Sequence, residues 1–190
     1  SNLGVGAALE TGYKYALKHN FDFLVQMDGD GQHLADELSS ILLPVINDKA
    51  DMVIGSRYTK NGKTTVNIPF FRHIGHCLFS FITNLCCGCF IKDPTSGFKA
   101  LNQKALKFFT ENEYPYDHPD SDVIIMSVKS GIRILEVPVK MLERTSGKSQ
   151  YSGLKPIYYA IKMLLSIFIV LLNHRHWQII RNNKTQQGEK

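Results

Sequence analysis

Two aspartates one residue apart are the side chains in this sequence best placed to do chemistry. Asp28 and Asp30 follow the apolar run Phe21–Met27, and a glycine comes directly after each of them. Two carboxylates this close repel each other unless a cation lies between them, and hard divalent cations prefer oxygen ligands. The pattern therefore predicts a metal clamp on a nucleotide diphosphate. The spacing also allows an alternative, an ordinary polar turn after a strand.

A calcium-binding loop is excluded by the residues that follow. The EF-hand pattern requires glycine at its sixth position and glutamate at its twelfth. Counted from Asp28, those positions hold His33 and Ser39, and the preceding segment has the composition of a strand rather than a helix.

The segment Asp28–His33 resembles the D-x-D-G-Q-H element of family 2 glycosyltransferases. The resemblance is closest to the branch that contains dolichyl-phosphate mannosyltransferase and its bacterial polyprenyl-phosphate relatives. Further matches follow in the expected order at Gly55–Tyr58, Asp93–Ala100, Glu136–Val139 and Arg144–Ser149. Together they extend from Asn2 to about Lys162, so the resemblance rests on an ordered series and not on one short motif.

This resemblance implies an α/β fold of the GT-A type, with a mixed, mainly parallel sheet flanked by helices. Family members begin with a strand, a helix and a second strand that hold the nucleotide, and nothing here matches them. The chain also opens on Ser1 and not on methionine. We therefore expect a glycosyltransferase domain that is incomplete at its N-terminus.

The resemblance also assigns roles to the residues around the donor. Asp28 and Asp30 are implied to hold Mg²⁺ or Mn²⁺, with Gln32 adding a neutral oxygen ligand, and oxygen donors of this kind suit both ions. Arg144 and Lys148, in an Arg-x-x-Gly-x-Ser pattern, are implied to meet the donor diphosphate from the far side.

Two arginines are implied to hold the phosphate of the acceptor. Arg57 is expected at a strand end and Arg72 near a helix start, and a guanidinium matches phosphate oxygens bidentately. Solvated surface arginines are the alternative interpretation.

A catalytic base is needed only if the acceptor is a hydroxyl, because a lipid phosphate is already ionised near neutral pH. Asp93 is the candidate, since the family's Asp-x-x-x-Gly-Phe element places an acid near the reacting carbon of the sugar. Turn formation by Asp93-Pro94 is the alternative. Asp120 and Asp122 are reserve candidates.

The elements that must position these residues follow from periodicity and turn signals. Strands are expected over 21–27, 51–55 and 132–139, the last in the interior of the sheet, with a strand entry at 97–98. Helices are expected over about 7–18, 36–47, 70–85, 103–109, 121–130 and 157–172. Ligand groups gather at the carboxyl ends of parallel strands, and this rule brings Asp28, Asp30 and Arg57 to one edge.

Three parts of the chain are distinguished: a glycosyltransferase domain over 1–152, an amphipathic helix within 153–176 and a polar tail over 177–190. Six apolar residues share one face of the helix, which is too short to span a bilayer: Ile157, Ile161, Leu164, Leu165, Phe168 and Leu172. An interfacial helix on the membrane and a helix packed on the domain remain equally open, with a transmembrane span third.

Composition sets wider limits. The 190 residues are 44% hydrophobic and 21% charged, as in a globular domain. A net charge of +5 suits an anionic membrane surface or a phosphorylated substrate. Nucleic acid is disfavoured because the basic residues are scattered instead of forming a stripe interleaved with aromatics.

The four cysteines include no C-x-x-C pair. With His73 and His76 nearby they could form a zinc site, but the spacing does not match the common structural types, and free thiols in a reducing cytosolic setting are favoured.

These observations lead to one main hypothesis and two alternatives. The main hypothesis is an inverting, metal-dependent transfer of a sugar from a UDP- or GDP-linked donor to a polyprenyl- or dolichyl-phosphate lipid, at the cytoplasmic face of the membrane. The first alternative is transfer to a saccharide hydroxyl during synthesis of cell-surface polysaccharide. The second, from another class, is a non-catalytic basic binding module or an inactive fragment.

Overall fold

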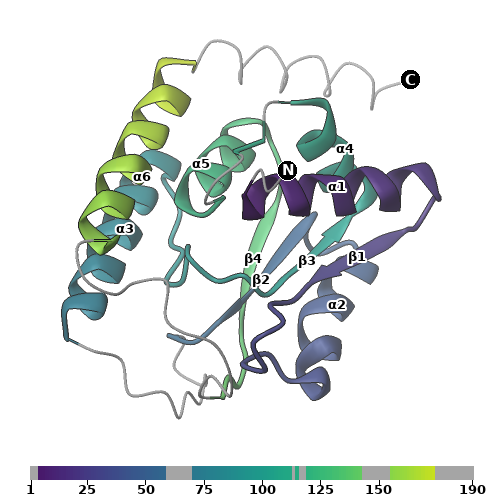
Figure 1. The fold of residues 1–190 in the computed structure, drawn as a ribbon. Coiled ribbons are helices and arrows are strands. Elements are labelled where there is room, and N and C mark those ends of the chain that lie inside the picture. The colour runs from purple at the N-terminus through teal and green to yellow at the C-terminus, as the bar shows by residue number, and fades with distance from the viewer. Residues whose placement is uncertain (1–3, 59–69, 113, 116–118, 143–154, 174–190) are drawn as a thin grey trace.

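The protein is an α/β domain in which helices flank a mixed four-stranded sheet (Figure 1). The computed structural model describes residues 4–58, 70–112, 114–115, 119–142 and 155–173. The strands are β1 (Phe23–Gln26), β2 (Met52–Ser56), β3 (Lys99–Asn102) and β4 (Ile134–Pro138). The helices are α1 (Val5–Lys18), α2 (Leu38–Ile46), α3 (Phe70–Cys87), α4 (Gln103–Glu111), α5 (Ser121–Lys129) and α6 (Lys155–Leu172). A single 3₁₀ turn, Ala35–Glu37, precedes α2.

The strand order is β1-β3-β2-β4, and β3 alone runs against the others. It pairs antiparallel with both β1 and β2, so that Ala100 lies between Val25 and Val53, whereas β4 pairs parallel with β2. The prediction of a mixed sheet flanked by helices is therefore confirmed: three of the four described strands run in one direction, although two of the three strand pairs are antiparallel. Because β3 is reversed, it begins at the end of the sheet where β1 and β2 finish. The residues that precede β3 consequently lie beside those that follow β1 and β2.

Side chains alternate between two apolar cores, one on each face of the sheet. Met52 and Ile54 join the larger core with residues of α1, α3, α4, α5 and α6, whereas Val53 between them joins the smaller core under α2. The same alternation sends Leu101 and Ala100 of β3 to opposite faces. This period of two is what a strand covered on both faces requires.

The placement of residues 132–139 in the interior of the sheet was wrong, because β4 lies at an edge. Its run of apolar residues has another cause. Ile134 packs against the larger core and Val137 against the smaller one, so both faces of this edge strand are covered. At the opposite edge, β1 is half-buried rather than fully buried, and Phe23 is exposed.

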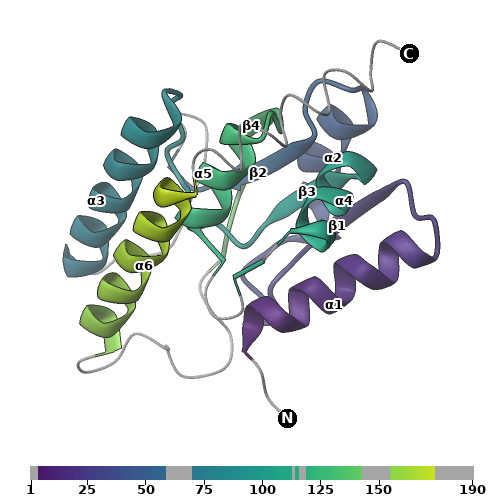
Figure 2. The same ribbon diagram turned by 90° about the horizontal axis from the view of Figure 1, so that it is seen from above.

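The helices α3, α5 and α6 gather at one end of the sheet, and α1 lies at the other (Figure 2). The helix α6 packs on the domain through Met163, Ile167 and Val170. The six apolar residues assigned to one face in the sequence all lie on the exposed side. Packing on the domain is thus confirmed, but through the opposite face. Within the residues described, no helix combines the length and apolar character that crossing a bilayer would need.

Candidate active site

Three segments meet at the end of the sheet where β1 and β2 finish. They are residues 27–33, residues 56–58, and residues 91–98 before β3. The imidazole of His33 shows how close their charges lie. Burial lowers the pKa of His33, and four charged groups act on it electrostatically: Asp28, Asp30, Arg57 and Asp93. The structure therefore brings together the acidic pair and Arg57, as the carboxyl-end rule predicted, and adds Asp93 to them.

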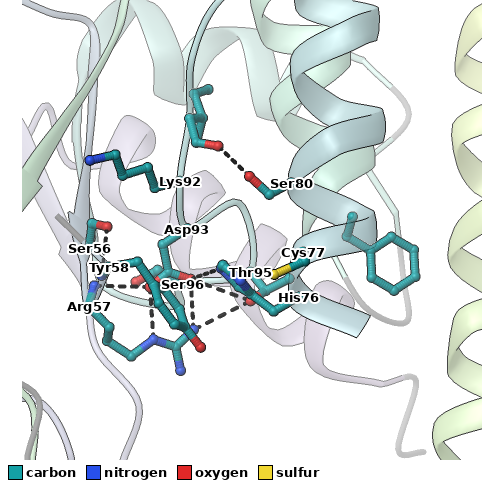
Figure 3. Close-up of polar contacts among 12 residues, drawn as sticks. Ser56, Arg57, Tyr58, His76, Cys77, Ser80, Lys92, Asp93, Thr95 and Ser96 are labelled. Atoms are coloured by element: carbon teal, nitrogen blue, oxygen red, sulfur yellow. Dashed lines mark hydrogen bonds and ion pairs between the residues drawn. The ribbon is translucent and has the colours of Figure 1, made fainter. Parts of the chain in front are cut away.

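Arg57 and Asp93 form a buried ion pair (Figure 3). The guanidinium donates from Nε to Asp93 Oδ2 at 2.8 Å and from Nη2 to Oδ1 at 2.7 Å, and the backbone N–H of Arg57 donates to Oδ2 at 3.1 Å. The Asp93 side chain is fully buried and that of Arg57 is 17% exposed. Burial alone would lower the pKa of Arg57, but the hydrogen bonds to Asp93 hold it above the usual range. Arg57 is thus not the solvated surface arginine of the alternative interpretation.

Asp93 is held in turn by Glu136 of β4. The Glu136 carboxylate accepts the backbone N–H of Asp93 at 2.6 Å and that of Lys92 at 3.0 Å. Asp93 also opens a turn, since its carbonyl accepts the N–H of Ser96 at 3.3 Å. The turn chemistry expected of Asp93-Pro94 and an electrostatic role of the side chain therefore coexist at this residue.

The carboxylate turn after β1 is fixed by hydrogen bonds of its own. Asp30 Oδ1 accepts the backbone N–H of Gln32 at 3.1 Å, across Gly31, whose φ of 78° is a conformation that favours glycine. The backbone N–H of Asp28 donates to His33 Nδ1 at 3.0 Å, which leaves the proton of the neutral ring on Nε2. The His33 ring also stacks on Phe98, with 4.8 Å between centroids.

The segment after β4 closes the turn from the other side. The N–H of Leu142 donates to the carbonyl of Gln32 at 3.0 Å, and Gln32 Nε2 donates to the carbonyl of Leu142 at 3.2 Å. Because the amide nitrogen is directed to Leu142, the oxygen is the end of this amide that suits a cation.

Gly97 makes room for one of the two carboxylates. A Cβ atom at this position would lie 2.7 Å from Asp28 Oδ2 and 2.9 Å from Oδ1, closer than real Cβ contacts allow. The Asp28 carboxylate therefore occupies the space that any larger residue at position 97 would fill. Two carboxylates and an amide oxygen form a donor set that fits Mg²⁺ or Mn²⁺, so the residues present suit the ion that the resemblance implied.

The other predicted site residues fall in different places. Arg72 lies in the first turn of α3, but its side chain is outside the described part of the structure, and Arg144 and Lys148 are outside it entirely. Asp120 and Asp122 lie at the start of α5, where Tyr159 and Ser166 of α6 donate hydrogen bonds to their carboxylates.

A buried lysine interacts electrostatically with these two acids and with Asp93 of the ion pair. Lys99, the first residue of β3, is only 2% exposed. Burial lowers its pKa, and the charges of four acids oppose that shift: Asp120, Asp122, Asp28 and Asp93. From the sequence, Lys99, Glu136 and His33 were given no role in the site, and His76 was named only as a possible zinc ligand. A signal existed for Glu136, which is the one charged residue in the apolar strand Ile134–Pro138.

His76 of α3 completes the surroundings of the ion pair. Its Nε2 lies 3.8 Å from Asp93 Oδ1, and its ring stacks on Tyr58 with 3.8 Å between centroids. No local pattern in the sequence indicates that α3 brings this residue to Asp93.

Comparison with known proteins agrees with this geometry. The family described as glycosyl transferase family 2 matches residues 1–109. The UDP-N-acetylglucosamine–dolichyl-phosphate N-acetylglucosaminyltransferase of Methanococcus voltae is 36% identical over 168 residues, which are 86% of this chain and 66% of the relative. The polyprenol monophosphomannose synthase of Mycolicibacterium smegmatis is 32% identical, over 80% of this chain and 58% of the relative.

The undecaprenyl-phosphate mannosyltransferase of Micrococcus luteus is also 32% identical, over 79% of this chain and 61% of the relative. The chain thus spans about two thirds of the length of these relatives, or somewhat less. The match to more than half of its residues, together with these relatives, shows that the chain belongs to glycosyl transferase family 2.

Proposed function

We propose that this chain provides the catalytic centre of an inverting, metal-dependent glycosyltransferase, which moves a sugar from a UDP- or GDP-linked donor to a polyprenyl- or dolichyl-type lipid phosphate. The observation that carries the proposal is the joint position of the Asp28–Asp30 turn and the buried Arg57–Asp93 pair at one edge of the sheet. Support for the acceptor class comes from the relatives, whose names specify dolichyl, polyprenol or undecaprenyl-phosphate substrates.

On the donor side, the difficulty is the negative charge that builds up on the departing nucleoside diphosphate. A bound Mg²⁺ or Mn²⁺ supplies Lewis-acid neutralisation of that charge. Asp28, Asp30 and Gln32 would hold the ion. Arg144 and Lys148 remain the proposed contacts to the diphosphate, on the basis of the sequence pattern.

On the acceptor side, Arg57 binds the lipid phosphate, with Arg72 as the second cation. An oxygen of the acceptor phosphate forms a bond to the anomeric carbon while the bond from that carbon to the diphosphate oxygen breaks, and the configuration inverts. The acceptor is already ionised, so no proton has to be removed. This agrees with the engagement of both Asp93 oxygens by Arg57.

Transfer to a saccharide hydroxyl is the second candidate, in which Asp93 would be the base. Asp93→Asn distinguishes the two. For a phosphate acceptor, the variant raises the acceptor KM because Arg57 loses its partner, whereas kcat at saturating acceptor falls only mildly. A severe loss of kcat would favour the hydroxyl acceptor.

We also propose that the chain works at the cytoplasmic face of a membrane. The helix α3 leaves Ile74, Leu78, Phe81 and Leu85 exposed at spacings of four, three and four residues, which form one apolar stripe. The helix α6 leaves its own stripe exposed, and both helices lie at the same end of the domain (Figures 1 and 2). Apolar stripes on a protein of net charge +5 suit an anionic bilayer.

Thermal unfolding of the full-length protein that contains this chain, with a panel of UDP- and GDP-sugars and with and without Mn²⁺, tests the donor side. We expect stabilisation that needs both a donor and Mn²⁺, and Asp30→Ala removes it along with turnover. Asp36→Ala, an exposed acid outside the turn, is the matched control and keeps both. Unchanged donor consumption in Asp30→Ala would remove the metal clamp from the proposal.

A further inference from the structure

The helix α3 carries a cluster of nitrogen and sulfur ligands that the proposed reaction does not use. His73, His76 and Cys77 occupy positions i, i+3 and i+4, which share one face of a helix. One potential ligand atom from each lies within 4.8 Å of the others. His73 Nε2 and Cys77 Sγ are 3.7 Å apart.

His76 supplies an independent reason to look for a ligand. Its side chain is 10% exposed, and neither Nδ1 nor Nε2 makes a hydrogen bond of good geometry with a described residue, although the backbone of Lys92 lies close enough to interact with the ring. The nearest charged atom, Asp93 Oδ1, is 3.8 Å from Nε2, which is too far for a hydrogen bond. A largely buried imidazole whose nitrogens make no well-aligned hydrogen bond is costly, and an ion is one of the recognised ways to satisfy it.

The donor types decide which ion the cluster suits. Zn²⁺ binds imidazole nitrogen at about 2.0–2.1 Å and thiolate sulfur at about 2.3 Å, so neighbouring ligands of a tetrahedral site are roughly 3.4–3.6 Å apart. The 3.7 Å between His73 and Cys77 is close to that edge length. Mg²⁺ and Mn²⁺ prefer oxygen and belong to the Asp28–Asp30 turn instead.

We propose that His73, His76 and Cys77 form a second cation site, which binds Zn²⁺ or a similar transition-metal ion. Three protein ligands leave a fourth position for water or an anion, as in zinc sites that take a further ligand. The site adjoins the Arg57–Asp93 pair, since His76 and Asp93 lie next to each other (Figure 3). The sequence favoured free thiols because the spacing of the cysteines does not match the common zinc motifs. The i, i+3, i+4 arrangement on α3 nevertheless brings Cys77 close to two histidines.

Metal titration of the full chain tests the proposal. We expect stoichiometric Zn²⁺ binding in competition with a chromophoric chelator, and a thiolate-to-metal charge-transfer band with Co²⁺. Cys77→Ser abolishes the band, and both Cys77→Ser and His73→Ala weaken Zn²⁺ binding about tenfold or more. Both residues are exposed, so metal-free thermal unfolding of the variants should match that of the original protein.

Matched controls exclude adventitious binding. Cys89→Ser and His19→Ala remove an exposed cysteine and an exposed histidine elsewhere, and both keep the Co²⁺ band and the Zn²⁺ affinity. Asp30→Ala also keeps them, because the two cation sites use different residues. The proposal is overturned if Co²⁺ gives no thiolate band, if Cys77→Ser retains it, or if Cys89→Ser removes it.

Discussion

The guanidinium of Arg57 and the carboxylate of Asp93 are joined by two nearly equal hydrogen bonds, of 2.8 and 2.7 Å, inside the domain. The pair uses Nε and Nη2, and Nη1 makes no hydrogen bond within the described residues. Asp93 thus fixes the plane of the guanidinium, Nη2 also donates to Thr95 Oγ1 at 3.4 Å, and Nη1 is left for a phosphate.

Arg57→Lys should therefore raise the acceptor KM and reduce kcat/KM roughly 100-fold, because an ammonium cannot reproduce the planar fork. Steady-state kinetics with a polyprenyl phosphate measure the effect. Arg133→Lys is the control, since Arg133 pairs with Asp51 and not with the site residues. An unchanged acceptor KM in Arg57→Lys would contradict the phosphate-binding role.

Glu136→Ala should destabilise the domain by about 2–4 kcal/mol, because two backbone N–H groups lose the only hydrogen-bond acceptor that they have among the described residues. Turnover should fall as well, since Asp93 loses its support. Chemical denaturation measures the first effect. Glu111→Ala, which removes an exposed i,i+4 partner of Lys107, should stay within about 0.5 kcal/mol. Equal stability of the two variants would show that Glu136 does not support the segment.

Gly97→Ala should weaken Mn²⁺ binding about tenfold or more, because the new methyl group would displace the Asp28 carboxylate. Calorimetric titration with Mn²⁺ reads the effect directly. Gly12→Ala in α1, where a Cβ meets nothing within 4 Å, should leave Mn²⁺ affinity unchanged and stabilise the helix by about 0.5–1 kcal/mol. Unchanged Mn²⁺ affinity in Gly97→Ala would show that Asp28 does not bind the cation.

Stability should fall in acid through Asp51. Burial alone would raise the pKa of Asp51, but hydrogen bonds from Arg133, Lys104 and Asn102 outweigh it and hold this pKa well below its usual range. The stabilisation is therefore present above the unfolded-state pKa, about 3.9, and is lost as the pH falls below it. Asp51→Asn should be less stable at pH 7 and should lose less stability between about pH 5 and pH 2. Asp22→Asn, an exposed control, should retain the original acid profile.

Vesicle binding tests the membrane proposal. Leu165→Glu together with Phe168→Glu should weaken co-sedimentation with anionic vesicles about tenfold or more, because each side chain stops burying apolar surface in lipid. Leu43→Glu changes an exposed leucine on α2 and should have no effect. Equal loss in both variants would point to a general effect of charge and not to α6.

The sequence predicted the secondary structure well, because apolar periodicity and turn residues are local signals. It also placed Asp28, Asp30 and Arg57 together, since the carboxyl ends of parallel strands share an edge. The edge position of β4 could not be predicted in the same way. A strand covered on both faces has the same apolar composition whether it lies in the middle of the sheet or at its edge.

The internal contacts of the site were beyond sequence reasoning. Arg57 and Asp93 are separated by many residues, and their pairing depends on the reversal of β3, which no local pattern encodes. For α6, the periodicity grouped six apolar residues that share the exposed side, but it did not identify Met163, Ile167 and Val170 as the packing face. It could not tell which face packs, and the more apolar face is the one that remains exposed.

The insertion of β3 between β1 and β2 has a consequence for how the protein acquires its activity. The unit from β1 through α2 to β2 is contiguous in sequence, yet β1 and β2 do not pair with each other, and the position of one relative to the other is set by β3 between them. The insertion of β3 closes a long loop and is slow relative to local folding. The site should therefore become able to bind substrate in the same late folding step that completes the sheet. A chain that stops before this step would be partly folded and inactive.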